Sequence, residues 1–213
     1  PYEADPGQFN MEEMHRNRLY MPDAGTAALA EAYLDRMMAE CNSVGGVVEC
    51  VIDGLPAGIG DPVFEKYDAS LAKAILSIGA VKGFEIGDGF QAAKSVGSEN
   101  NDAFRMDESG KIKKETNHAG GILGGISDGS RVVLRAAFKP TPSIAQQQQT
   151  VTRGMEETDI AIKGRHDPII VPRAVVVVEA MAALTTADLL LLSMTSRLDR
   201  IQEFFGVHNA EHL

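Results

Sequence analysis

The sequence predicts an α/β protein of the α+β type, in which mixed or antiparallel sheets pack on helices. Two observations lead to this class. The expected strands alternate apolar and polar residues, as half-buried strands do, whereas strands of a doubly wound parallel sheet are nearly all apolar. Helical and extended segments also alternate only loosely along the chain. With 213 residues and no repeat at a solenoid period, the chain is expected to form one domain over residues 1–213.

The first half of the chain is expected to hold two helices and two strands. Asp23 is a favourable N-cap for a helix over residues 23–42. Residues 47–53, VVECVID, alternate as a strand does. Asp61 and the proline after it predict the start of a second helix, which Gly79 ends, and VKGFEIG then predicts a strand. The apolar residues at helical spacing are Leu29, Tyr33 and Met37 in the first helix and Phe64, Tyr67, Leu71 and Ile75 in the second.

The second half begins with a polar, turn-rich stretch over residues 95–118, for which we expect a mobile loop with one hairpin. RVVLRAAFK, residues 131–139, alternates strictly and predicts a strand with a basic outer face. The two prolines of KPTPSI exclude a helix there. The polar run QQQQ, residues 146–149, is expected to be exposed, and a further strand is expected near residues 159–163.

A long apolar helix is expected over residues 174–194, after the turn GRHDP. Its length raises the question of a membrane span. Glu179 and Asp188 interrupt it, and carboxylates inside a lipid span are costly. We therefore expect no membrane span but a helix buried between sheets or at a subunit interface.

Charge and cysteine content limit the partners. Lys and Arg total 20 against 30 Asp and Glu, and a net charge of −10 repels nucleic acid and anionic membranes. Two cysteines, Cys41 and Cys50, provide neither a metal-site spacing nor a disulfide framework, and Cys50 is expected to be a buried reduced thiol. No secretory signal opens the chain, so a cytoplasmic location is expected, and the missing initiator Met indicates a processed chain or a fragment.

The stretch NHAGGILGGISDG, residues 117–129, holds five glycines in thirteen residues. Glycine is used where φ must be positive or where another group must approach the backbone closely. The loop is therefore either a tight structural turn or a surface laid against a flat ligand. Within it, His118 is a candidate ligand or base, although a hydrogen-bonded structural histidine is the commoner case.

GDGFQA, residues 87–92, matches the G-x-G-x-x-A pattern of dinucleotide-binding loops, which would indicate a nicotinamide oxidoreductase. The helix after it is expected to end by Gly97, and no apolar parallel strand with an acidic tip follows. A tight strand-to-helix turn explains this motif better.

Two polar turns are further candidates. KPTPS, residues 139–143, places a lysine and hydroxyl groups at a strand end, where they can hold a phosphate or a flat anionic ring. The commoner case is a surface lysine before a proline-stiffened loop. In GRHDP, Arg165, His166 and Asp167 are candidates for a catalytic group, although spacing alone favours Asp167 as a turn or helix cap.

Taken in order, GDGF with GSENND, NHAGGILGGISDG, RAAFKPTPSI and GRHDP with VPRAVVVVEAM resemble the carboxy-terminal half of chorismate synthase. RNRLYMPD, residues 16–23, also resembles that family's RCPD region, with Met21 in place of the usual cysteine. The match covers nearly the whole chain.

This resemblance implies a β-α-β sandwich and a homotetramer. It implies a lyase of aromatic amino-acid biosynthesis, which removes phosphate from 5-enolpyruvylshikimate 3-phosphate by anti-1,4 elimination to give chorismate. Reduced FMN (FMNH2) is the implied cofactor, and it is thought to lend electron density to C–O cleavage. Some members also reduce their own flavin with NADPH.

The resemblance also implies site residues, carried over by position. Asp167 resembles the aspartate beside flavin N5 that assists proton removal. Gly124 would let the backbone lie against the flavin ring, where a Cβ would collide. The implied flavin-binding positions are Gly79, Ala80, Gly124, Lys139, Pro140, Thr141, Pro142, Ser143 and Arg165. No metal site is implied.

The family's amino-terminal half is missing from this sequence. That half carries a G-x-S-H-G motif, a second catalytic histidine and the arginines that bind the substrate, and His118 and His166 match neither catalytic histidine. The alternative interpretation is therefore a truncated, catalytically inactive fragment with a structural or oligomerising role and a partial FMN surface. Such a fragment would leave strand edges or apolar faces exposed.

Overall fold

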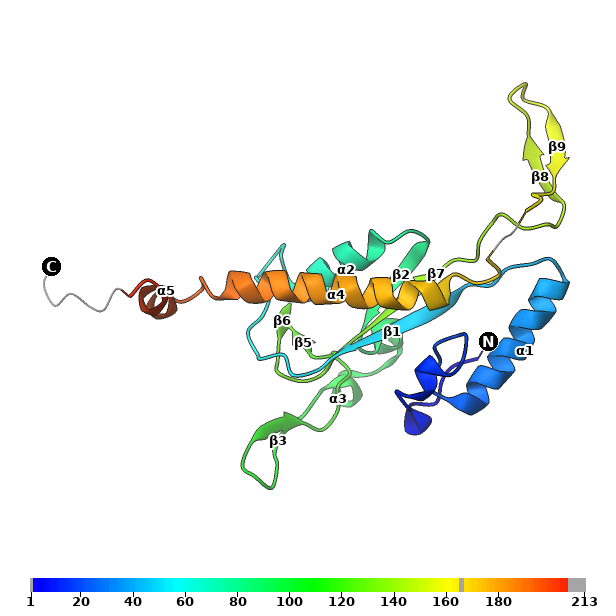
Figure 1. Ribbon diagram of the computed structural model, residues 1–213. Helices are drawn as coiled ribbons and strands as arrows, with labels where there is room; N and C mark the ends of the chain where they lie inside the picture. Colours follow the sequence, from blue (N-terminus) through cyan, green and yellow to red (C-terminus); the bar gives the residue numbers. More distant parts are fainter. Residues whose placement is uncertain (1, 165–166, 207–213) are drawn as a thin grey trace, which may run out of the picture. The chain divides into compact units, whose positions relative to one another are not determined.

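The structure, a computed structural model, describes residues 2–164 and 167–206 (Figure 1). The chain divides into two compact units. Unit 1 comprises Pro1–Val48 and Ala137–Val177, and unit 2 comprises Glu49–Ala136 and Val178–Leu213. Helices and small antiparallel sheets are both present, as predicted for an α+β protein, while a single domain over residues 1–213 stays a prediction.

Unit 1 begins with two short 3-10 helices and one α-helix, η1 (Pro6–Gln8), η2 (Glu13–His15) and α1 (Ala24–Ala39). The prediction that Asp23 caps this helix is confirmed, because its carboxylate accepts the backbone N–H of Gly25 at 2.9 Å. The buried face of α1 carries Ala27 and Leu34, whereas Leu29 is 57% exposed. The helix is thus where the cap predicts it, but its buried face is only partly the predicted one.

A hairpin of β8 (Gln148–Val151) and β9 (Glu157–Ile160) belongs to the same unit. The two strands pair antiparallel, from Gln148 opposite Ile160 to Val151 opposite Glu157. Their residues are almost all exposed, which confirms the prediction for the glutamine run. The strand expected near residues 159–163 begins two residues earlier, because it pairs with the glutamine run.

Three strands form the largest sheet, in the order β1-β7-β2. Their bounds are β1 (Gly46–Ile52), β2 (Val81–Ile86) and β7 (Val132–Phe138). The alternation predicted for the central strand β7 is confirmed, since Val132, Leu134 and Ala136 are each 0% exposed.

The helix α2 (Tyr67–Leu76) supplies three fully buried side chains to the core of unit 2. The predicted stripe residues confirmed as buried, each 0% exposed, are Tyr67, Leu71 and Ile75. The start predicted at Asp61 is wrong, because Val63 has a φ of +74°, which no α-helix accommodates. Phe64 therefore lies outside the helix and is 87% exposed.

The polar stretch after β2 folds into short elements, η3 (Gly89–Lys94), α3 (Gly97–Asn100), β3 (Phe104–Met106) and β4 (Ile112–Lys114). The single hairpin expected in residues 95–118 is confirmed, because β3 and β4 pair antiparallel with Phe104 opposite Lys114. The strand β4 thereby leads directly into the glycine-rich stretch.

The long apolar helix is α4 (Val171–Ser193), which is followed by α5 (Leu198–Phe204). Among the described residues, α4 is the one helix whose length and composition would allow it to cross a membrane, and 17% of its most apolar window is buried. Val178 and Leu189 are at most 6% exposed, whereas Leu184 and Leu191 are 66% and 64% exposed. Within the described chain, the face of α4 that carries Leu184 and Leu191 is therefore not buried between sheets as expected. A subunit interface on that face stays a prediction.

The two faces of α4 predict different responses to a polar substitution. Leu184→Gln changes an exposed side chain and should alter the free energy of unfolding by less than about 0.5 kcal/mol. Leu189→Gln buries an unpaired amide, so it should cost about 2–4 kcal/mol. Urea unfolding followed by circular dichroism measures both, and equal losses would show that the two faces are not distinct.

Candidate functional site

The glycine-rich stretch forms a tight hairpin in unit 2. Its strands β5 (Ile122–Leu123) and β6 (Ile126–Ser127) pair antiparallel, with Leu123 opposite Ile126. The two residues between them, Gly124 and Gly125, have φ values of +61° and +86°. A two-residue turn with both φ angles positive favours glycine at both places. The backbone conformation itself therefore explains this GG pair.

Gly124 differs from its neighbours in what a side chain would meet. A Cβ on Gly125 would lie 2.3 Å from the Lys66 side chain, and one on Gly121 would lie 2.5 Å from the Arg131 carbonyl oxygen. A Cβ on Gly124 would have no atom within 4 Å. Gly124 thus presents bare backbone to open space, as a position that faces a flat ligand must.

The GDGFQA motif has a structural role in this unit. A Cβ on Gly87 would lie 2.1 Å from the His118 carbonyl oxygen, and one on Gly120 would lie 2.4 Å from the Gly87 nitrogen. The N–H of Asp88 also donates to the His118 carbonyl at 2.8 Å. The two glycine-containing turns lie against each other, so no room remains for a pyrophosphate at Gly87. This close packing supports the strand-to-turn interpretation over a dinucleotide site.

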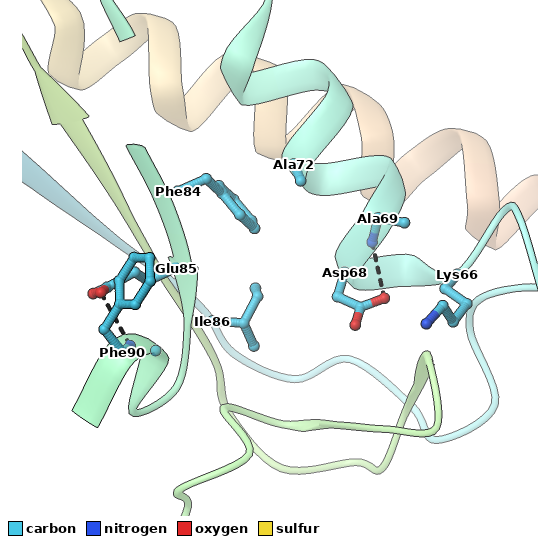
Figure 2. Close-up of a pocket in the computed structure, with 9 residues that line it drawn as sticks. Lys66, Asp68, Ala69, Ala72, Phe84, Glu85, Ile86 and Phe90 are labelled. Atoms are coloured by element: carbon cyan, nitrogen blue, oxygen red, sulfur yellow. Dashed lines mark hydrogen bonds between the residues drawn. The ribbon is translucent and has the colours of Figure 1, made fainter. Parts of the chain in front are cut away.

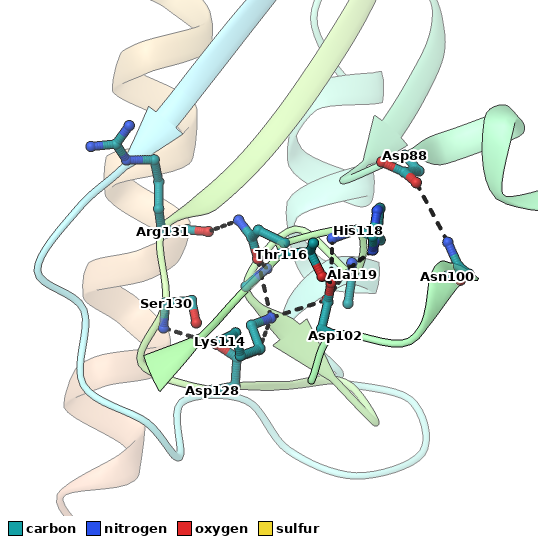
Figure 3. A network of polar contacts seen from close by, with 12 residues as sticks. Asp88, Asn100, Asp102, Lys114, Thr116, His118, Ala119, Asp128, Ser130 and Arg131 are labelled. Atoms are coloured by element: carbon teal, nitrogen blue, oxygen red, sulfur yellow. Dashed lines mark hydrogen bonds and ion pairs between the residues drawn. The ribbon is translucent and has the colours of Figure 1, made fainter. Parts of the chain in front are cut away.

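The base of the glycine hairpin is held by a buried polar network that the sequence analysis missed (Figure 3). Its centre is Lys114, whose ammonium lies 2.7 Å from Asp128 Oδ2 and 3.3 Å from Asp102 Oδ2. The side chains of these three residues are 2%, 7% and 3% exposed, respectively. Lys114 and Asp102 belong to the stretch expected to be a mobile loop, and a lysine in a polar run gives no sequence sign of burial.

The carboxylate of Asp102 also fixes the start of the glycine-rich stretch. It accepts the backbone N–H groups of His118 at 2.8 Å and Ala119 at 3.0 Å, and the hydroxyl of Thr116 at 2.7 Å. Burial alone would raise the pKa of Asp102, but these hydrogen bonds and the one from Lys114 hold it well below its usual range. The Nδ1 atom of His118 lies 3.0 Å from Asp102 Oδ1 but is buried without a hydrogen bond among the described residues, so both interpretations of this histidine stay predictions.

In unit 1, one backbone segment, residues 43–45, contacts both the KPTPS turn and the residues that directly follow Asp167. Ser43 donates its hydroxyl to the Thr141 carbonyl at 2.6 Å. On the other side, the Val44 N–H donates to the Pro168 carbonyl at 2.8 Å, and Val44 bridges Ile169 in parallel. A Cβ on Gly45 would lie 2.3 Å from the Phe138 carbonyl oxygen. The KPTPS turn and the segment after Asp167, which are separated in sequence, therefore contact the same three residues.

Two charged candidates of unit 1, Lys139 and Asp167, are at least partly accessible. Lys139 is exposed at the end of β7. The Asp167 side chain is 36% exposed, and its Oδ2 lies 2.6 Å from Arg173 Nη1. This contact holds the Asp167 carboxyl group in one orientation. Arg165 and His166 lie outside the described residues.

Gly79 and Ala80 lie in unit 2, in the turn between α2 and β2. Ala80 has a φ of +71°, a conformation that favours glycine, and a Cβ on Gly79 would meet no atom within 4 Å. The implied flavin positions thus fall into two groups. Gly79, Ala80 and Gly124 belong to unit 2, and the KPTPS turn and Asp167 belong to unit 1.

A cleft of about 400 Å³ lies between α2 and β2 in unit 2 (Figure 2). Phe84, Ile86 and Phe90 provide apolar walls, and Lys66 and Asp68 stand at the end nearest the start of α2. A second cleft of about 650 Å³, between α2 and α4, includes Asp61, Glu65, Lys73 and Asp188 in its lining. Within the described chain, no three His, Cys, Asp or Glu side chains gather as metal ligands.

The two cysteines differ in environment. Burial, together with the nearby Glu179, raises the pKa of Cys50 to about 11, whereas Cys41 is exposed. At pH 8 only about one Cys50 thiol in a thousand is ionised, and the thiolate is the reactive form. We expect Ellman's reagent to modify Cys41 at least ~100-fold faster than Cys50. The variant Cys41→Ser should abolish the fast phase, and two equally fast thiols would contradict this assignment.

The glycine hairpin, the basic strand end and the small antiparallel sheets define an α+β protein with backbone-rich candidate ligand positions. Comparisons with known proteins identify the family within this fold class. The family model for chorismate synthase matches residues 6–191. Chorismate synthase of Agathobacter rectalis is 62% identical over 205 residues, which are 96% of this chain and 56% of that protein. The protein of the same name from Lachnoclostridium phytofermentans is 58% identical over the same shares.

A crystal structure of chorismate synthase has the same fold, with a TM-score of 0.72 and 29% identity over 95% of this chain and 55% of that chain. The chain belongs to the chorismate synthase family. It spans about half the length of the relatives that it matches. The predicted family and fold class are therefore confirmed, and the comparisons do not favour the alternative of an inactive fragment.

Proposed function

We propose that the protein to which this chain belongs is a chorismate synthase, a lyase that eliminates phosphate from 5-enolpyruvylshikimate 3-phosphate to form chorismate. The observation that carries this proposal is the 62% identity to the Agathobacter rectalis enzyme over 96% of the chain. The second support is the agreement of fold with a solved chorismate synthase.

The described residues fit the reduced FMN that this activity implies. Reduced FMN, when bound, supplies electron density to the breaking C–O bond. Gly124 offers bare backbone with no neighbouring atom in the way, which suits contact with a flat ring. The exposed ammonium of Lys139 would offset the negative charge of the flavin or its phosphate. Arg165 and the remainder of the KPTPS turn are proposed as further contacts.

Asp167 is proposed as the residue that assists proton removal. Its carboxyl group is partly exposed and is held by Arg173 at 2.6 Å, so it is accessible and oriented. A homotetramer, a cytoplasmic location and flavin reduction by NADPH belong to the same proposal.

A chimera tests the proposed activity. Residues 1–213 would replace the matching region of the Agathobacter rectalis enzyme, which supplies the part that this chain does not span. The chimera, supplied anaerobically with reduced FMN and substrate, should release chorismate and phosphate in equal amounts. A folded chimera that binds FMN but makes no chorismate would refute the proposal. The chain alone, assayed in parallel, tests the inactive-fragment alternative, which chorismate formation by that chain would exclude.

Single substitutions in the chimera test the site. Lys139→Ala should weaken FMN binding about 10- to 100-fold, because it removes a charge-assisted contact. Asp167→Asn should lower kcat and leave FMN affinity nearly unchanged. Lys163→Ala, which removes a lysine outside the implied flavin positions, is the matched control and should change neither value. Unchanged FMN affinity in Lys139→Ala would show that the assignment of this residue is wrong.

A further inference from the structure

The glycine hairpin is tied at its base by a single buried cation. The ammonium of Lys114 has three N–H donors and three acceptors, at 2.7 Å from Asp128, 3.1 Å from Asn117 and 3.3 Å from Asp102. Its side chain is 2% exposed, so it cannot touch a bound ligand directly. The role of this lysine must lie in what its three partners hold.

Those partners hold both ends of the hairpin. Before it, Asp102 binds the N–H groups of His118 and Ala119. After it, Asp128 accepts the N–H of Ser130 at 2.8 Å and donates its own N–H to the Gly121 carbonyl at 3.0 Å.

The third partner joins the two ends. Asn117 accepts the N–H of Gly121 at 2.9 Å and donates to the Arg131 carbonyl at 2.8 Å. Figure 3 shows Lys114 between the carboxylates of Asp102 and Asp128. Both strands of the hairpin therefore leave from positions that one ammonium group fixes.

We propose that Lys114 is a positioning residue for flavin binding, which holds the Gly124 turn in place by neutralising two buried carboxylates. The proposal rests on the proposed function. Without the ammonium, Asp102 and Asp128 become uncompensated buried charges that repel each other, so the base of the hairpin opens. The turn at Gly124 then loses its fixed position, and the free energy needed to order it weakens FMN binding.

FMN titration of the chimera tests this inference. Lys114→Met should weaken FMN binding at least ~10-fold, and kcat at saturating FMN should recover to within about twofold of the parent. Lys114→Arg, which retains the charge, should restore most of the affinity. Lys113→Met, on the exposed neighbour in β4, is the matched control and should leave the affinity unchanged.

The double variant with Asp128→Asn gives a second, charge-specific readout. Removing one of the two carboxylates should recover part of the affinity lost in Lys114→Met, because the repulsion at the hairpin base is gone. Unchanged affinity in Lys114→Met would overturn the proposal, as would a loss of kcat at saturating FMN with affinity intact.

Hydrogen exchange of the chain without flavin tests the role of Lys114 at the hairpin base independently of FMN binding and of the proposed function. Lys114→Met should speed exchange of the Gly121 amide, which Asn117 holds, and leave the Ile75 amide in α2 unchanged. Uniformly faster exchange would show a general structural role and overturn the proposal. If the parent chimera fails to bind FMN while the Gly121 amide responds as expected, the proposed function fails, whereas the fixing of the hairpin base by Lys114 stands.

Discussion

Gly120→Ala is expected to lower the free energy of unfolding by about 3–5 kcal/mol, because two backbones meet at this position. A Cβ on Gly120 would lie 2.4 Å from the Gly87 nitrogen and 2.7 Å from the Gly87 Cα. Backbone atoms cannot rotate away as a long side chain can. Gly87 is also fixed by its N–H bond to the Val133 carbonyl at 3.0 Å, so relief of the clash would disturb the central strand.

Gly124→Ala is the matched control for this substitution. The two glycines have nearly equal φ values, +63° at Gly120 and +61° at Gly124, so both variants carry the same left-handed strain of about 1 kcal/mol. Only Gly120 adds a collision, since a Cβ on Gly124 meets no atom within 4 Å. Urea unfolding of both variants measures the difference, and equal losses would show that strain alone explains the glycines.

Asp102→Asn is expected to lower the free energy of unfolding by about 3–5 kcal/mol at pH 7. The substitution leaves the buried Lys114 ammonium with one carboxylate partner in place of two. It also places amide N–H donors near backbone N–H groups that need an acceptor. The same substitution should flatten the acid limb of the stability curve. Asp102 has a depressed pKa in the folded state, so its stabilisation is complete above its unfolded pKa and is lost as the pH falls through the folded value. The loss should therefore begin below about pH 4.

Urea unfolding between pH 7 and pH 2 measures both effects. The difference between the parent and Asp102→Asn curves should shrink steadily from about pH 4 down to pH 2, because the unfolded parent binds a proton at Asp102 that the folded parent does not. Asp107→Asn is the control, because Asp107 lies in the exposed turn of the β3–β4 hairpin and should have a smaller effect. Parallel curves for the parent and Asp102→Asn would contradict the assigned role of this carboxylate.

Local sequence patterns predicted the elements that depend on neighbouring residues alone. The N-cap at Asp23 and the strict alternation of β7 are both found. A cap needs only the next three residues, and alternation needs only one buried face. The ordered motifs were sufficient to indicate the family, and the comparisons confirm it.

Contacts between distant residues decided what the sequence could not. The helix α2 begins five residues later than its cap-like sequence predicts, at Tyr67, where the N–H meets the Gly125 carbonyl at 2.8 Å. The GDGFQA motif resembles a nucleotide-binding loop in sequence, yet its first glycine packs against the His118 carbonyl. Neither outcome has a local cause.

The sequence by itself thus determined the family, the secondary-structure class and the candidate turns, because short-range sterics and motif order encode them. Only the tertiary structure showed which glycines pack against backbone and that Gly124 alone, of those in the hairpin turn, faces open space. It also revealed the ammonium of Lys114 between two carboxylates that lie 12 and 14 residues away. The burial of a side chain depends on the distant residues that pack against it, and the sequence of a polar run does not indicate those contacts.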